Sequence, residues 1–318
     1  MLSGQQQMES GHERVYLSVV APVFNEQDTL EELYARLVRA LEGTGHPFEV
    51  IFVDDGSTDG SLALLRNLRA KDRRIRVLRL ARNFGQSAAL YAGLAAARGS
   101  MMFIIDADLQ VHPEDLPLLL ERLEAGADSV SGRRRDRQDS LFRRWASRAL
   151  NWYIGRAIGA PLHDFGCSLK GFRRHVVDAM IAMPHRCRYL PAEMALAGGR
   201  IEEVWVNHSE RARGQSKYGL LKLVRTAFDL ITGLTDAPLR LVSVGGVLFS
   251  LAGFLMFLRV LWVRLTHGNV LQVESVIALF FLFSGVQLLA IGLLCAYIGR
   301  IFIEVQSKPL YIVREELE

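Results

Sequence analysis

The chain has 318 residues, half of them hydrophobic, and carries a formal net charge of +4. This length allows one large or two medium folding units. The three cysteines are odd in number and lack the spacing of a metal site, so we expect them to be reduced, ordinary residues on the cytosolic side or in a membrane helix. The polar start, MLSGQQQMESGHER, contains no signal peptide, so we expect the catalytic part to stay in the cytoplasm.

Residues 15–110 alternate apolar, strand-like runs with helical patterns. The predicted strands are VYLSVVAPV (15–23), FEVIFVDD (48–55), IRVLRL (75–80) and MMFIIDADLQ (101–110). Helices are predicted between them, from about residue 29 to 41, after residue 58, and from 85 to 98, where apolar positions recur at helical spacing. Strands that alternate with helices favour an α/β fold with a doubly wound, mostly parallel sheet.

Acidic and polar residues stand where three of these strands end. They are Pro-Val-Phe-Asn-Glu at 22–26, Asp-Asp-Gly-Ser at 54–57, and Asp106 and Asp108. Doubly wound sheets bind ligands at the carboxyl ends of their strands. An Asp-x-Asp sequence suits a hard cation such as Mg²⁺ or Mn²⁺ that also binds phosphate oxygens. The pattern therefore predicts a crevice for a nucleotide diphosphate with its metal.

A cluster of arginines follows, at positions 133, 134, 135, 137, 143, 144 and 148. Such a cluster is typical of a surface that faces anions, although each arginine could also be a solvated loop residue. The cluster lacks the interleaved aromatic residues of a nucleic-acid-binding module, so we expect no nucleic acid partner.

The character of the chain changes after residue 213. Residues 214–240 include KYGLLKLVRTAFDLITGL, a basic amphipathic pattern typical of a helix in a membrane interface. Within 241–300, two apolar runs (241–263 and 276–298) are long enough for two transmembrane helices. Lys and Arg are richer outside this pair than in its loop, which predicts cytoplasmic termini. Two buried helices of a soluble protein are the alternative. The expected organisation is a cytoplasmic domain (1–213), juxtamembrane helices (214–240), the membrane pair (241–300) and a cytoplasmic tail (301–318).

The motifs carry a family resemblance. APVFNE, VDDGSTDGS and IDADLQ, followed by ARNFGQSAALYAG, RRRDRQDSLFRRWAS, HDFGCSLKGFRR and RARGQSKYG, resemble family 2 glycosyltransferases with the GT-A fold. Together with the paired apolar runs, they are similar to polyprenyl-phosphate glycosyltransferases. Within that family, RQDSLFRRWAS and DFGC are most similar to the bacterial members that transfer 4-deoxy-4-formamido-L-arabinose in lipid A modification and polymyxin resistance.

The resemblance implies an inverting, metal-dependent transfer from a UDP-sugar to undecaprenyl phosphate at the cytoplasmic face of the bacterial inner membrane. It also implies a multi-pass membrane protein and a homo-oligomer, since similar proteins assemble as tetramers. Three alternatives stay open: transfer of a hexose such as glucose or mannose, a non-catalytic nucleotide-sugar scaffold, and a processive polysaccharide synthase. The last has a Gln-x-x-Arg-Trp motif, which Leu141 interrupts here.

The resemblance further implies roles for single residues. The expected metal and diphosphate ligands are Asp106, Asp108 and Gln110. The expected nucleotide-sugar positions are Pro22, Phe24, Glu26, Asp54, Asp55 and Ala107. The expected acceptor-phosphate positions are Arg133, Arg143 and Ser147. The basic motif expected to close over the pyrophosphate contains Arg211, Ser216 and Lys217.

Asp164 is expected either to contact the sugar or to brace a turn, and the catalytic set comprises Asp108, Arg133, Arg143 and Asp164. Cys167 is expected to be a small packed residue rather than a nucleophile. One departure concerns the loop after Asp108, where Val-His-Pro-Glu at 111–114 replaces the family's frequent paired prolines.

Overall fold

A computed structural model of the chain describes residues 15–135, 162–183, 189–209, single positions between 239 and 266, 273–306 and 308–318. The chain forms two compact units. One, the sheet unit, comprises Met1–Lys217 with Pro309–Glu318, and the other, the helical unit, comprises Tyr218–Lys308.

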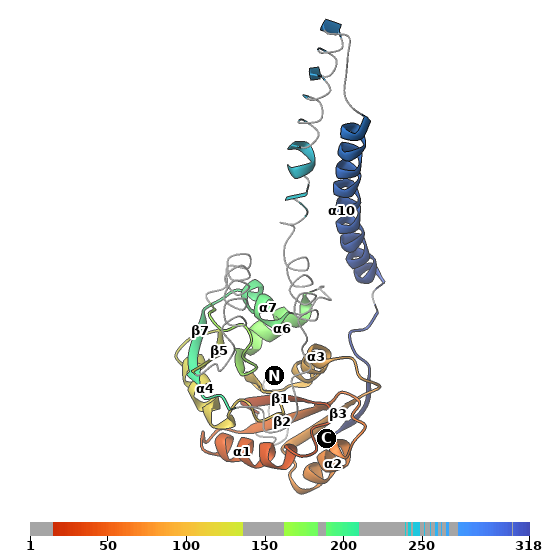
Figure 1. Cartoon of the computed structure of the whole chain (residues 1–318). Coiled ribbons are helices and arrows are strands. Elements are labelled where there is room, and N and C mark those ends of the chain that lie inside the picture. Colours follow the sequence, from red (N-terminus) through yellow and green to blue (C-terminus); the bar gives the residue numbers. More distant parts are fainter. Residues whose placement is uncertain are drawn as a thin grey trace, which may run out of the picture. The chain divides into compact units, whose positions relative to one another are not determined.

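The sheet unit is built on an eight-stranded sheet with the strand order β7-β5-β6-β4-β1-β2-β3-β8 (Figure 1). The four predicted strands are confirmed as β1 (Leu17–Val23), β2 (Phe48–Asp54), β3 (Ile75–Leu80) and β4 (Met101–Ile104). They are parallel to one another, with β1 between β4 and β2.

The remaining strands make the sheet mixed. They are β5 (Ser129–Arg134), β6 (Lys170–Arg173), β7 (Ile201–Val206) and β8 (Val313–Leu317). Strand β6 runs antiparallel to both β4 and β5, and β8 runs antiparallel to β3. The predicted α/β sheet is therefore present, and its two antiparallel strands are β6, which lies between β5 and β4, and β8, which lies at the edge.

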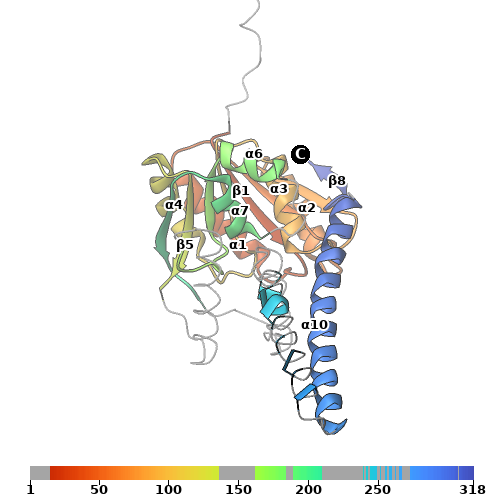
Figure 2. The same ribbon diagram turned by 90° about the horizontal axis from the view of Figure 1, so that it is seen from above.

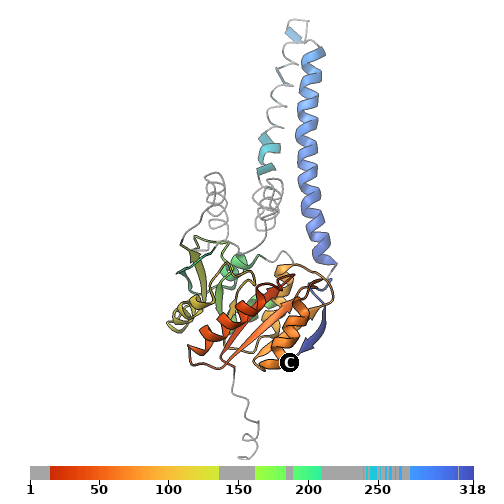
Figure 3. The ribbon, with the colours of Figure 1, turned by 60° about the horizontal axis from the view of Figure 1, so that its bottom comes forward.

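Helices cover both faces of this sheet, as Figures 1 and 3 show. One face packs against α1 (Leu30–Glu42), α2 (Ser61–Lys71) and α4 (Leu116–Glu124), which follows the 3-10 turn η1 (Pro113–Asp115). The other packs against α3 (Gln86–Ala96), α6 (Arg174–Ala182) and α7 (Leu190–Ala197). Because side chains alternate along a strand, Val19 and Ala21 belong to the first core and Val20 to the second.

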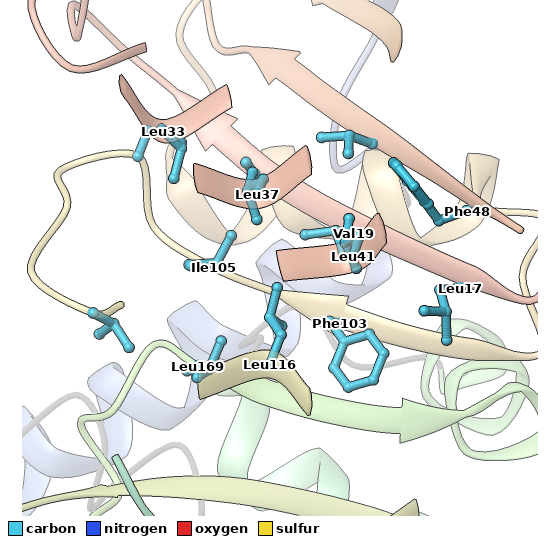
Figure 4. Packing of buried hydrophobic residues seen from close by; sticks show 14 of the residues in the cluster. Leu17, Val19, Leu33, Leu37, Leu41, Phe48, Phe103, Ile105, Leu116 and Leu169 are labelled. Atoms are coloured by element: carbon cyan, nitrogen blue, oxygen red, sulfur yellow. The ribbon is translucent and has the colours of Figure 1, made fainter. Parts of the chain in front are cut away.

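Helix α1 illustrates how the sequence pattern produces this packing. Its four buried leucines recur at helical spacing, each at most 1% exposed: Leu30, Leu33, Leu37 and Leu41. In Figure 4, three of them lie over β1 and β4, near Val19, Ile105 and Phe103. Burying one such side chain contributes about 1.5–3 kcal/mol. This stripe therefore holds the loop that precedes α1 at the edge of the sheet.

Helix α3 packs even more closely against the sheet. A Cβ atom at Gly93 would lie 2.3 Å from Val20 Cγ1 and 2.9 Å from Val53 Cγ2. Only glycine fits at that distance, so the helix backbone lies directly over β1 and β2. This contact places the first residue of α3, Gln86, at the carboxyl ends of the central strands.

The segment after the helical unit returns to the sheet. Strand β8 pairs with β3 (Figure 2). Just before β8, the carbonyl of Ile312 accepts a hydrogen bond from Ala81 N at 2.9 Å. The buried Arg76 joins Glu49 (3.0 Å) to Glu316 (2.6 Å). Part of the expected cytoplasmic tail is thus an edge strand held by ion pairs across the sheet.

The helical unit contains α10 (Val273–Val305), a helix of 33 residues that includes the second predicted apolar run. Among the helices that the structure describes, none meets the length and hydropathy required of a bilayer span. The first predicted run and the predicted juxtamembrane helices fall mostly on residues outside the described ones.

A buried carboxyl in α7 makes stability depend on pH. Burial raises the pKa of Glu193 from 4.5 to about 8. Between these two values the native protein holds a proton that the unfolded chain has lost, so the free energy of unfolding falls as pH rises through this window and is level above it. We expect Glu193→Gln to remove this fall, because glutamine keeps the shape of the protonated side chain.

Thermal unfolding of the purified protein at pH 5 and pH 8.5 measures this effect. At each pH we take the unfolding midpoint of Glu193→Gln minus that of the wild type. This difference should be roughly 5–10 °C larger at pH 8.5 than at pH 5. Glu121→Gln, an exposed position on α4, is the control and should follow the wild type. Parallel curves for the wild type and Glu193→Gln would contradict the expectation.

Candidate active site

Three loops meet at the carboxyl ends of β4, β1 and β2, which are neighbours in the sheet. Hydrogen bonds join them: Thr58 N donates to Asn25 Oδ1 at 2.8 Å, and the Thr29 hydroxyl donates to the Ala107 carbonyl at 2.7 Å. Because these partners are far apart in sequence, only the sheet topology brings them together. The three loops that were predicted to surround one crevice are therefore joined by hydrogen bonds at the carboxyl-end edge of the sheet.

Two residues at this edge have strained backbones. Asn25 and Leu109 have φ angles of 58° and 59°. A bulky residue in the left-handed region costs of order 1–3 kcal/mol and such residues cluster at functional sites. At Leu109 the turn folds the chain back, so that Gln110 N donates to Asp108 Oδ1 at 3.1 Å. Two of the three expected ligands, Asp108 and Gln110, therefore lie on one tight turn.

Asp106 is held from two sides. Its Oδ1 accepts a hydrogen bond from Gln86 Nε2 at 2.6 Å, and a hydrogen bond from the Ser168 side chain also reaches it. Burial and the negative charge of Asp108 raise the pKa of Asp106 to about 6, against the opposing effects of Ser168, Gln86 and Lys170. Two carboxylates thus repel each other in a poorly solvated place, which a bound cation would relieve.

The donor set fits a metal that is shared with a substrate. Among the described residues, no three His, Cys, Asp or Glu side chains are grouped so as to hold a metal by themselves. Asp106 and Asp108 supply two carboxylates, and Gln110 supplies an amide oxygen on the same turn. Mg²⁺ and similar ions are commonly bound by one or two carboxylates together with substrate phosphates. The residues present therefore fit such an ion.

The adjacent Asp54 and Asp55 have different surroundings. Both oxygens of Asp55 are occupied, by Phe84 N at 2.7 Å and Gly85 N at 2.9 Å, so it braces the loop before α3. Asp54 Oδ1 accepts from Ser57 N at 3.1 Å, whereas its buried Oδ2 has no hydrogen-bond partner among the described residues. Of the two, Asp54 has the capacity to accept a hydrogen bond from a ligand.

The other expected nucleotide-sugar positions lie around the same edge. Pro22 is half-buried in β1, opposite Val53, and Phe24 just beyond it is 44% exposed. Glu26 is half-buried, and its backbone N–H donates to the Ser61 hydroxyl at 3.0 Å. The exposed phenyl ring leaves an aromatic face open to solvent beside the loops.

Arg133 is the penultimate residue of β5, and its guanidinium is stacked on Trp205 of β7, 4.2 Å from the ring centroid. The two residues are register partners, and Trp205 is 47% exposed. The stacking presents the charge of Arg133 on a rigid support rather than on a flexible side chain. The remaining expected phosphate-binding residues lie outside the described part of the chain: Arg143, Ser147, Arg211, Ser216 and Lys217.

Asp164 is buried and engaged by Arg134. Arg134 Nε and Nη2 donate to its two oxygens at 2.7 and 2.8 Å, and Gly166 N donates at 3.2 Å. Of the two roles weighed for Asp164, these contacts are those of a brace that ties the loop 162–169 to the end of β5.

Several residues around Asp106 and Arg133 are not identified by the sequence pattern. Gln86, Ser168 and Lys170 lie within quoted motifs, but nothing in their spacing indicates that they surround Asp106. Trp205 gave the clearest signal, because a tryptophan at an outward position of IEEVWV is an unusual residue for a solvated strand.

Comparison with known proteins identifies the class. Residues 18–181 match the model of glycosyl transferase family 2, and the chain belongs to this family. It is therefore a glycosyltransferase, with a GT-A-like mixed α/β sheet. A solved mycobacterial protein shares the fold, with a TM-score of 0.51 and 22% sequence identity over 69% of this chain and 74% of its own.

Two curated relatives are similar along nearly their whole length. The undecaprenyl-phosphate 4-deoxy-4-formamido-L-arabinose transferase of Proteus mirabilis is 41% identical over 303 residues, covering 94% of this chain and 93% of that protein. The transferase of the same name from Pseudomonas aeruginosa is 42% identical over 304 residues, covering 93% and 89%. The family resemblance of the motifs is thereby confirmed.

Proposed function

We propose that the protein transfers 4-deoxy-4-formamido-L-arabinose from its UDP conjugate to undecaprenyl phosphate, with inversion at the anomeric carbon. The observation that carries this proposal is the similarity, through nearly the full length of both chains, to transferases named for this sugar and this lipid. The modification of lipid A is the process in which such a product would be used.

The donor site is proposed at the carboxyl ends of β4, β1 and β2. In this proposal Phe24, which is exposed, and Asp54, whose Oδ2 has no hydrogen-bond partner among the described residues, would contact the nucleoside, while Asp106, Asp108 and Gln110 would hold Mg²⁺ or Mn²⁺ with the diphosphate. When bound, such an ion supplies positive charge to the departing diphosphate. The hydrogen bonds from Gln86 and Ser168 to the Asp106 carboxylate would orient it for this task.

The acceptor needs little chemical activation. A phosphate monoester has a second pKa near 6 and is largely dianionic at neutral pH, so no general base is required. An oxygen of the lipid phosphate attacks the anomeric carbon, and the bond from this carbon to the UDP oxygen breaks on the opposite face. Arg133 on its Trp205 support, with Arg143 and Ser147, would orient the attacking phosphate. Arg211, Ser216 and Lys217 would close over the leaving group.

Membrane attachment is proposed from the sequence and from α10. The two apolar runs would insert into the bacterial inner membrane and leave the sheet unit and both termini in the cytoplasm. Large apolar side chains of α10 are more than 60% exposed, as expected of a surface that contacts lipid: Phe280, Leu288, Ile298, Phe302 and Val305. Assembly as a homo-oligomer such as a tetramer is part of the same proposal and comes from the resemblance alone.

A donor panel tests the proposal. Purified full-length protein in detergent would be incubated with Mn²⁺ or Mg²⁺, undecaprenyl phosphate and single UDP-sugars, and lipid-linked product detected by mass. We expect product with the formamido-arabinose donor and none without lipid phosphate. Product with glucose or another hexose alone would keep the transferase chemistry and overturn the sugar. Absence of both product and UDP release with every donor would overturn the proposal.

A further inference from the structure

Lys170 is a buried ammonium for which the proposed chemistry gives no direct role. It begins β6, where its register partners are Ile104 of β4 and Ser131 of β5, and it is only 2% exposed. Its Nζ donates to the Ser131 hydroxyl at 2.9 Å and to the Cys167 carbonyl at 2.7 Å. Both acceptors are neutral, and no carboxylate of the described residues forms an ion pair with it.

A charge in this position is costly for the fold. Removing an ammonium from water costs several kcal/mol, which two neutral acceptors and the charges of Asp164 and Glu203, neither of them ion-paired with Lys170, offset only in part. The lowered pKa of Lys170, caused first by burial, reflects this cost. The strand itself needs only a side chain that packs between Ile104 and Ser131, and an unbranched apolar residue would satisfy that need. The charge therefore calls for an explanation outside the packing of the sheet.

The contacts of Lys170 lead to Asp106. The Cys167 carbonyl that Nζ holds belongs to the peptide bond joining Cys167 to Ser168. The Ser168 side chain in turn hydrogen-bonds Asp106, and the positive charge of Lys170 acts on the same carboxyl. Lys170 thus reaches Asp106 by two routes, one through the orientation of Ser168 and one through space.

We propose that Lys170 is a positioning residue of the donor site, which orients Ser168 toward Asp106 and places a fixed positive charge beside the Asp106–Asp108 pair. Because the carboxylate pair and the diphosphate are both anionic, this charge favours their close approach with the metal. The inference rests on the proposed binding of a nucleotide diphosphate at this edge, and it adds that the buried interior of β6 contributes to that binding.

The test compares UDP binding with folding in Lys170→Met, a neutral side chain of similar length. The dissociation constant for UDP in the presence of Mn²⁺ would be measured by titration calorimetry, and the unfolding midpoint by thermal denaturation. We expect the dissociation constant to rise about tenfold, as for loss of a group that orients a metal ligand. The unfolding midpoint should stay near or above that of the wild type, because an apolar residue replaces a buried charge. A lower midpoint with unchanged UDP affinity would show a purely structural role and overturn the proposal.

Two further variants complete the test. Ser168→Ala removes only the route through Ser168 and should weaken UDP binding by a smaller factor than Lys170→Met, and the double variant should bind little worse than Lys170→Met alone. Ser129→Ala is the matched control, since Ser129 is a buried serine of β5 whose hydroxyl has no hydrogen-bond partner among the described residues. Wild-type affinity in Ser168→Ala would overturn the proposal even if Lys170→Met failed to fold. Failure of the wild type to bind UDP with Mn²⁺ would instead overturn the proposed function.

Discussion

Replacing Asp108 with asparagine is expected to lower the turnover number of sugar transfer about a thousandfold. The amide keeps the size of the side chain and can still accept the hydrogen bond from Gln110 N, so the tight turn at Leu109 should persist. What is lost is one of two adjacent negative charges, on which the binding of a divalent cation with the diphosphate depends.

The rate of UDP release at saturating donor and lipid phosphate, measured across a Mn²⁺ series, gives the turnover number of Asp108→Asn. Asp178→Asn is the control, because that carboxylate is exposed on α6, away from the strand ends. It should match the wild type. A turnover number for Asp108→Asn within tenfold of the wild type would contradict the assignment of Asp108 to the metal.

Replacing Arg134 with methionine is expected to reduce the free energy of unfolding by about 3–5 kcal/mol. The substitution removes both side-chain donors to Asp164 and leaves this carboxylate buried beside the end of β5. The double variant Arg134→Met, Asp164→Leu removes both charges and should recover most of the loss, since two apolar side chains can replace a buried ion pair.

Denaturant unfolding followed by circular dichroism would measure the free energies of unfolding of the wild type, of Arg134→Met and of the double variant. Arg200→Met, which breaks an exposed pair with Glu202, should change the free energy of unfolding little. If the double variant were as unstable as Arg134→Met, the loss would come from packing rather than from an uncompensated charge. Loss of activity in a double variant of recovered stability would give Asp164 a role in the chemistry as well.

The strand ends could be predicted from sequence because the signals are local. An apolar run that stops at Asp54 or Asp106 marks both the strand and its carboxyl end, and the parallel topology then brings the loops together. The different hydrogen-bonding partners of Asp54 and Asp55 could not be predicted from the sequence. The two are adjacent and chemically identical, and their roles depend on the loop at Phe84 and Gly85, about thirty residues later in the chain.

Long-range pairs are the other contacts that no local pattern predicts. Asp164 looks like a turn residue until the fold places Arg134 against it, and Lys170 looks like a surface lysine until β4 and β5 enclose it. Strand β8 has the sequence VREEL, a charged pattern that is also typical of a solvated chain end. Its glutamates meet Arg66 and Arg76, which belong to a different part of the chain, so no local pattern could identify a strand there.

The position of β8 also bears on how the enzyme is made. The ribosome produces β1 to β7 first, then the whole helical unit of residues 218–308, and only then the strand that pairs with β3. During that interval β3 is an open edge, with unpaired backbone groups of the kind that recruit other chains. Synthesis of residues 218–308 therefore sets the delay before this edge is covered. Shortening that segment or slowing its synthesis would change how long the nascent enzyme is prone to aggregate.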